Sequence, residues 1–111
     1  MTESEFLAAA DQVLGAIEAG IERAAGEGDV DIECARSGNV LEIELLDNGS
    51  KIIVNSQSAM QEIWIAARSG GFHYRLQDGR WINTRDGSEL FEALSGMLRS
   101  QGAPGISLSP R

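Results

Sequence analysis

The chain has 111 residues, of which 42% are hydrophobic, so it can form one folded domain with a modest core. One cysteine and one histidine exclude an internal disulfide, a cysteine-rich metal cage and a histidine-cluster site. No apolar run approaches the roughly 18 residues that span a bilayer, and the N-terminus is acidic where a secretory signal is basic. We therefore expect a cytoplasmic protein with no membrane partner.

The negative charge is concentrated in one half of the sequence. Residues 1–50 hold twelve acidic and two basic residues, whereas residues 51–111 hold five acidic and seven basic ones. The acidic half would repel phosphate groups, so nucleic acid is not an expected partner, and cations or a basic protein surface are favoured instead. Acidity for solubility alone is the alternative. It accounts for the net charge of −8 but not for its segregation.

The first predicted element is a helix. Apolar residues recur at helical spacing over residues 6–21, which predicts a helix from about residue 4 to about residue 24. Thr2 and Glu5 fit a capping box at its start. Two glycines inside this helix each weaken it by about 1 kcal/mol relative to alanine, namely Gly15 and Gly20.

A run of short strands follows. Alternation of apolar and polar residues between turn signals predicts strands over residues 29–34, 40–46, 51–55, 62–67, 72–76 and 80–83. The dipeptides Asn48-Gly49 and Asp78-Gly79 are strong hairpin signals. No crossover helix separates the strands, so the sheet is expected to be mainly antiparallel.

A second helix closes the predicted domain. The apolar stripe over residues 90–98 predicts a helix to about residue 101, and Asp86 with Glu89 offers a capping box for it. Each helix must bury one stripe, so both are expected on one face of the sheet, which leaves the other face open. The fold class is therefore α+β, with a single domain over residues 1–101. Residues 102–111 are expected to form a loose or extended tail.

Carboxylates gather on the first helix and on the strand that follows it. Asp11, Glu18 and Glu22 fall within one narrow stripe beside the apolar face of the helix. Alternation places the acids of the first strand together on its outer face. If helix and strand lie edge by edge, they form one acidic ridge, whose members are Asp11, Glu18, Glu22, Glu27, Asp29, Asp31 and Glu33.

Such a ridge suits hard cations. Oxygen ligands favour Fe²⁺, Fe³⁺, Mn²⁺, Ca²⁺ or Mg²⁺ over soft metals, and an open row of flexible side chains predicts weak binding at several sites. The acids lack the spacing of a calcium-binding loop. The alternative is that they form a solvated face without a ligand.

The sequence shows no convincing combination of residues for catalysis, so no enzyme activity is expected. His73 has no evident nucleophile or acid partner in the sequence, and Cys34 alternates with Ile32 as a core thiol would. The glycines at 70 and 71 precede a strand rather than opening a phosphate-binding helix.

The central segment is the most specific part of the sequence. Residues 48–66 read NGSKIIVNSQSAMQEIWIA, followed by Gly-Gly-Phe-His-Tyr at 70–74 and Trp-Ile at 81–82. This pattern closely resembles the frataxin family in its bacterial CyaY-type branch, and the resemblance covers about residues 2–101. It implies two helices on one face of an antiparallel sheet, the frataxin-like α/β sandwich.

The resemblance also implies a function. Family members bind iron, Fe²⁺ or Fe³⁺, weakly through an acidic ridge, and in bacteria dock on the cysteine desulfurase of the iron–sulfur scaffold machinery to regulate cluster assembly. The implied state is a monomer that can form iron-dependent oligomers. The implied partner-binding residues are Asn55, Gln57 and Trp64. Alternation supports this independently, because Ile63 and Ile65 should face the helices and turn Trp64 to solvent.

The sequence departs from the family pattern at several places. Ala19, Arg23 and Ala25 stand where acids are frequent, and Glu62 stands where glutamine is usual. Two alternative functions therefore remain. An iron store or ferroxidase needs paired inward carboxylates and Glu-x-x-His motifs, which one histidine does not supply. A pure protein-interaction domain would bind iron only incidentally.

Overall fold

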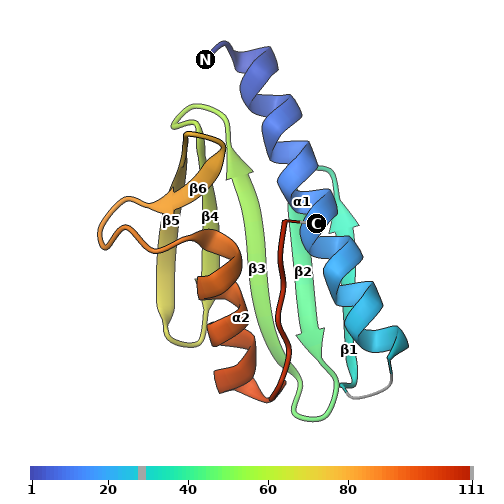
Figure 1. The fold of residues 1–111 in the computed structure, drawn as a ribbon. Helices are drawn as coiled ribbons and strands as arrows, with labels where there is room; N and C mark the ends of the chain where they lie inside the picture. Colours follow the sequence, from blue (N-terminus) through green and yellow to red (C-terminus); the bar gives the residue numbers. More distant parts are fainter. Residues whose placement is uncertain (28–29, 111) are drawn as a thin grey trace.

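The protein is a two-layer structure of two helices on one face of a six-stranded sheet (Figure 1). The computed structural model describes residues 1–27 and 30–110. Its elements in chain order are α1 (Glu3–Gly26), β1 (Ile32–Ser37), β2 (Val40–Leu45), β3 (Ser50–Gln57), β4 (Glu62–Ala67), β5 (Gly70–Gln77), β6 (Arg80–Asn83) and α2 (Leu90–Gln101). In this part of the chain neither helix is long and apolar enough to cross a membrane. The predicted α+β fold class is confirmed.

The first helix begins at its predicted capping box. The amide of Glu5 donates to Thr2 Oγ1 at 3.1 Å, and the amide of Thr2 donates to Glu5 Oε1 at 2.8 Å. The apolar stripe is buried against the sheet, from Phe6, 1% exposed, to Ile21, fully buried. Helical periodicity thus predicted which face of α1 is buried.

The sheet is an antiparallel meander in which every strand pairs with its neighbours in sequence, β1 to β6. The Asp78-Gly79 turn has φ of 50° and 81° at its two residues, the double left-handed conformation of the tight hairpin that this dipeptide predicts. The pairing places Asn55 opposite Trp64, and Trp64 opposite His73, in one row. This row lies on the face away from the helices.

The predicted capping box at Asp86 is wrong. Gly87 has a φ of 75°, so the chain cannot be helical there, and Asp86 instead accepts the Ser88 amide at 2.9 Å. Glu89 is the N-cap of α2, since its carboxylate accepts the amides of Phe91 at 2.8 Å and Glu92 at 3.0 Å. An acid one turn later than predicted satisfies the free amides of the first turn.

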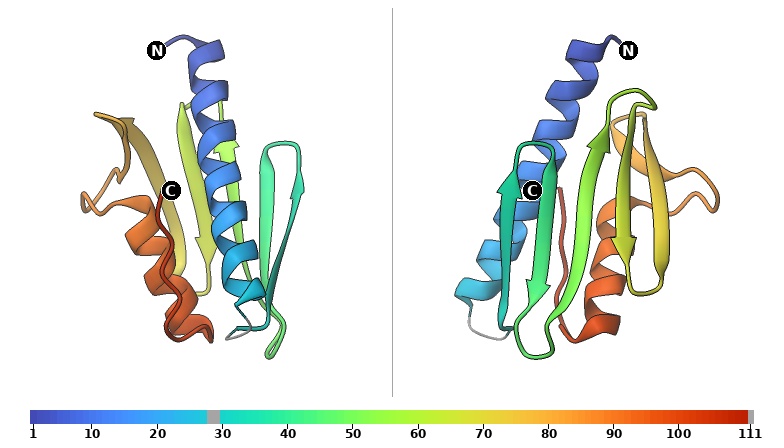
Figure 2. Two further views of the ribbon diagram at one scale, coloured as in Figure 1. Left: turned by 45° about the vertical axis from the view of Figure 1, so that its right-hand side comes forward. Right: turned by 180° about the vertical axis from the view of Figure 1, so that it is seen from behind.

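The tail after α2 is extended but not loose. It runs back between the two helices (Figures 1 and 2), where Ala103 is fully buried and Ile106 and Leu108 are 4% and 6% exposed. The Leu108 amide donates to Ser95 Oγ at 2.8 Å, and the Arg99 guanidinium donates to the Ile106 carbonyl at 2.7 Å. Of the two expected forms, loose or extended, the tail takes the extended one, and its apolar side chains pack between α1 and α2.

Candidate functional site

The negative charges of acids on α1 and β1 act on one partly buried thiol, that of Cys34. The pKa of Cys34 is raised to about 11, first by burial of the thiol and then by the negative charges of Glu18, Glu22 and Glu33. The three carboxylates therefore affect the pKa of the same thiol, although Glu18 and Glu22 lie on α1 and Glu33 lies on β1. Cys34 packs against the edge of the core, as its alternation with Ile32 suggested.

The start of the acidic ridge is neutralised by an arginine. Arg36 of β1 lies 2.5 Å from Asp11 of α1, Nη2 to Oδ1, and its Nε also donates to the Gly38 carbonyl at 3.1 Å. The Asp11 side chain remains 74% exposed. No pattern in the sequence predicts this pair, because the two residues are 25 positions apart and only the packing of α1 on β1 brings them together.

The remaining predicted ridge residues differ in position. Glu27 is the exposed C-cap of α1, and Asp31 is exposed immediately before β1. Asp29 lies outside the described residues. Among residues 1–27 and 30–110, no three histidine, cysteine or acidic side chains are grouped so that they could hold a metal ion. A cation at this surface would take much of its coordination shell from water.

The open face of the sheet presents the second predicted set of residues. Gln57 Nε2 donates to Asn55 Oδ1 at 2.7 Å, and both side chains are partly exposed. Trp64 is also partly exposed and stacks on His73, with ring centroids 4.4 Å apart and an interplanar angle of 8°. We call Asn55, Gln57, Trp64 and His73 the Trp64 surface.

Beneath this surface lies a carboxylate that the sequence analysis noted only as a departure from the family pattern. Glu62 is only 4% exposed, accepts Trp64 Nε1 at 2.8 Å and Arg75 Nε at 2.9 Å, and lies 3.5 Å from His73 Nδ1. Burial alone would raise the pKa of Glu62, but the hydrogen bonds from Trp64 and Arg75 and the nearby positive charges hold it below its usual value.

Glu62 is thus the acid partner that the sequence analysis did not find for His73. Alternation already placed Glu62 on the same face as Trp64. The missing information was the register of β4 on β5, which sets Glu62 opposite Arg75 and Trp64 opposite His73.

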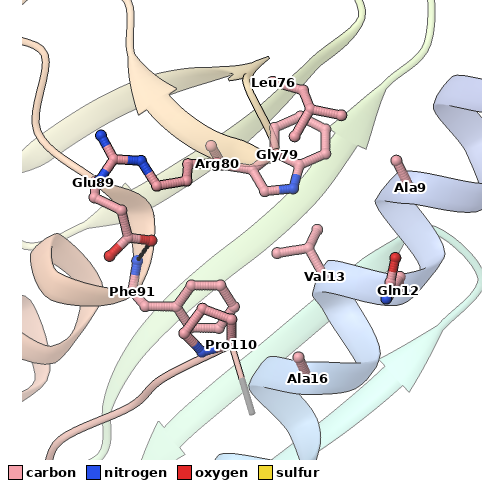
Figure 3. Close-up of a pocket in the computed structure, with 11 residues that line it drawn as sticks. Ala9, Gln12, Val13, Ala16, Leu76, Gly79, Arg80, Glu89, Phe91 and Pro110 are labelled. Atoms are coloured by element: carbon pink, nitrogen blue, oxygen red, sulfur yellow. Dashed lines mark hydrogen bonds between the residues drawn. The ribbon is translucent and has the colours of Figure 1, made fainter.

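A third candidate is an apolar cavity of about 380 Å³ between α1, the β5–β6 hairpin and the start of α2 (Figure 3). Its apolar lining includes Val13, Trp81, Phe91 and Pro110. Of its polar lining residues, Glu89 already caps α2, as the dashed bond to Phe91 in Figure 3 shows. This lining offers no nucleophile paired with a base, so no reaction is assigned to it.

Known proteins resemble the chain over nearly all of its length. A family model described as "Frataxin-like domain" matches residues 1–103. An "Iron-sulfur cluster assembly protein CyaY" of Janthinobacterium sp. (strain Marseille) is 64% identical over 102 residues, 92% of this chain and 91% of that one. A protein of the same name from Herminiimonas arsenicoxydans is 59% identical over 108 residues, 97% of this chain and 96% of that one.

Solved structures agree with these sequence matches. Frataxin from Psychromonas ingrahamii superposes with a TM-score of 0.86 at 31% identity, over 100% of this chain and 99% of that one. A trimeric frataxin from the yeast Saccharomyces cerevisiae, described as complexed with ferrous, shares the fold at 24% identity and a TM-score of 0.72, over 83% of each chain. The family model and the relatives confirm what the central segment suggested, and the chain belongs to the frataxin-like family.

Proposed function

We propose that this protein is a cytoplasmic, non-enzymatic regulator of iron–sulfur cluster assembly. In this role it binds iron weakly at the acidic ridge and docks on the cysteine desulfurase and its scaffold machinery. The proposal rests on the membership of the chain in its family and on relatives named as iron–sulfur cluster assembly proteins. The protein acts as a monomer, with oligomers formed only when iron is bound.

The iron-binding ridge is supported by Glu18 and Glu22 on α1 and Glu33 on the neighbouring strand β1, whose negative charges all raise the pKa of the Cys34 thiol. Negative charges that raise the pKa of a nearby thiol also attract cations to the same region of the surface. Asp11 contributes less, because Arg36 offsets its charge. Iron is therefore expected to bind near Glu18, Glu22, Glu33 and Asp31 rather than at Asp11, where the ridge begins.

Iron binding is tested by anaerobic titration with Fe²⁺, followed by NMR. Backbone signals near Glu18, Glu22 and Glu33 should broaden or shift first, and changing all three to glutamine should abolish the effect. The matched control changes three exposed acids away from the ridge, Glu3→Gln, Asp78→Asn and Glu92→Gln, which alters the net charge equally. Equal loss of iron binding in the control would show that net charge, not the ridge, attracts iron.

Docking is supported by two features of the surface. The ridge presents negative charge, and the Trp64 surface presents an aromatic ring flanked by amides, the composition that interface anchors favour. A desulfurase with a basic surface would contact both. A pull-down with the organism's own desulfurase tests this, and affinity should fall as salt rises. Affinity that does not change with salt would contradict docking by charge.

A pure protein-interaction domain is the second candidate function. It is favoured by the finding that the described acids form no group able to enclose a metal ion. This reading predicts that the triple glutamine variant loses desulfurase binding, whereas Fe²⁺ shifts no signal of the wild-type ridge. The Fe²⁺ titration and the desulfurase pull-down together therefore separate the candidates.

A further inference from the structure

We propose that Glu62 is a positioning residue of the Trp64 surface, and that its buried carboxylate fixes the indole of Trp64 in the orientation that a partner meets. This inference rests on the proposed docking function and deepens it. The side chain of Glu62 is only 6% exposed, so a partner would not contact it directly. Its effect on docking must pass through the exposed or half-exposed side chains that it contacts, which are Trp64, Arg75 and His73.

Both carboxylate oxygens of Glu62 are engaged by different donors. Oε1 accepts the indole Nε1–H of Trp64 at 2.8 Å, and Oε2 accepts Nε of Arg75 at 2.9 Å. The Arg75 side chain is 53% exposed and comes from the neighbouring strand. The carboxylate therefore links the Trp64 ring on β4 to the Arg75 side chain on β5.

The indole is held in two directions. The hydrogen bond to Glu62 fixes the edge of the ring that bears the nitrogen, and the stack on His73 at 4.4 Å fixes its plane. An aromatic side chain that is already ordered loses less rotational freedom when a partner binds. A Trp64 released from Glu62 would have to be ordered at the moment of docking.

The chemistry of residue 62 can be separated into two parts by substitution. The carboxylate of Glu62 accepts hydrogen bonds from Trp64 and Arg75, one at each oxygen. The side-chain amide of a glutamine has only one oxygen that can accept. Glu62→Gln can thus keep the bond from Trp64 while it loses the ion pair with Arg75. Glu62→Leu removes both. The matched control is Glu42→Leu, which removes an acid of β2 paired with Lys51 at 3.3 Å and leaves Trp64 untouched.

The first readout is the indole signal of Trp64 in ¹H–¹⁵N spectra, with Trp81 as an internal reference. Trp81 is 5% exposed and packs edge-on against Phe6 on the helix side of the sheet. In Glu62→Leu the Trp64 indole proton should exchange with solvent roughly tenfold faster, while Trp81 is unchanged. Glu62→Gln should restore most of the protection. Equal Trp64 exchange in wild type and Glu62→Leu overturns the proposal.

The second readout is affinity for the desulfurase. Glu62→Leu should weaken binding about tenfold, Glu62→Gln much less, and Glu42→Leu no more than any loss of one charge. If the wild type does not bind the desulfurase, the proposed docking function fails, and the indole readout still decides whether Glu62 positions Trp64. If Glu62→Leu frees the indole but binds as tightly as wild type, the positioning role in docking is overturned.

Discussion

Arg36 Nη2 lies 2.5 Å from Asp11 Oδ1, so an ion pair joins the edge strand β1 to α1 at Asp11, the first residue of the acidic ridge. The pair makes the ridge uneven. The charge of Asp11 is offset by Arg36, whereas the charges of Glu18, Glu22 and Glu33 all raise the pKa of Cys34. The charge that a cation meets is therefore set by packing as well as by the number of acids.

Changing Arg36→Gln should strengthen Fe²⁺ binding at the ridge, because it frees Asp11 and adds one net negative charge there. The stability cost should be below about 1 kcal/mol, since the ion pair is solvent-exposed on the side of Asp11. NMR-monitored Fe²⁺ titration measures the first effect and urea unfolding the second. The control is Lys51→Gln, which makes the same charge change but frees Glu42 on the open sheet face. Equal gains in both variants would contradict a local effect.

The thiol of Cys34 should react slowly with iodoacetamide at neutral pH, because its pKa is raised from 9.0 to about 11. The pH–rate profile of alkylation should therefore have its midpoint well above that of a free thiol. Changing Glu18 and Glu22 to glutamine should move the midpoint down, since two of the charges that oppose ionisation are removed. Changing Glu3 and Glu92 instead should leave it in place. A common midpoint in all variants would show that burial acts alone.

The same shift affects stability at alkaline pH. The folded chain keeps a proton on Cys34 that the unfolded chain releases near pH 9, so the free energy of unfolding should fall as pH rises from about 9 towards 11. Below pH 9 the thiol contributes no pH dependence. Cys34→Ala should remove this part of the alkaline loss, measured by urea unfolding at pH 8 and at pH 10.5. An unchanged pH dependence in Cys34→Ala would assign the loss to other groups.

The fold was predictable from the sequence because its signals are local. The alternation that defines β4 and the Asp78-Gly79 turn need only neighbouring residues, and an antiparallel meander pairs strands that adjoin in sequence. The start of α2 was placed too early because a capping pattern at Asp86 and Glu89 does not reveal that Gly87 adopts a left-handed conformation.

The candidate site was predictable only in part. The sequence could place Glu18 and Glu22 on one helix stripe and turn Trp64 to the open face. The pairs Arg36–Asp11 and Glu62–His73 depend on how α1 packs on β1 and on the β4–β5 register. The periodicity of a sequence does not show which side chains of different elements come into contact. The hydrogen bond between Glu62 and Trp64 was therefore not predicted.

Salt and divalent cations should raise the melting temperature of the wild type, because they screen repulsion among crowded carboxylates and bind the folded state preferentially. The triple variant Glu18→Gln, Glu22→Gln, Glu33→Gln should melt higher in low salt and gain less from Mg²⁺. Differential scanning fluorimetry in 20 and 300 mM salt and with millimolar Mg²⁺ measures both. The triple control at Glu3, Asp78 and Glu92 should keep the wild-type response to Mg²⁺. A wild type indifferent to salt and Mg²⁺ would show that the acids are too far apart to repel.

The tail and α1 meet at a glycine. A Cβ added at Gly20 would lie 2.9 Å from Cδ2 of Leu108, whereas nothing lies within 4 Å of one added at Gly15 on the same helix. The two positions thus differ in surroundings but not in helix propensity. Leu108 itself is 6% exposed, so its side chain is part of the packing that holds the tail between the helices.

Gly15→Ala should stabilise the protein by about 1 kcal/mol, whereas Gly20→Ala should gain little or nothing because Leu108 must move aside. Leu108→Ala should cost about 3 kcal/mol by removing buried methyl groups from the tail. In the Leu108→Ala background the obstacle is gone, so Gly20→Ala should become as stabilising as Gly15→Ala. Urea unfolding of the single and double variants measures this coupling. Equal effects of the two glycine substitutions in the wild-type background would mean that Leu108 yields without cost, and that the tail is packed less tightly than its burial indicates.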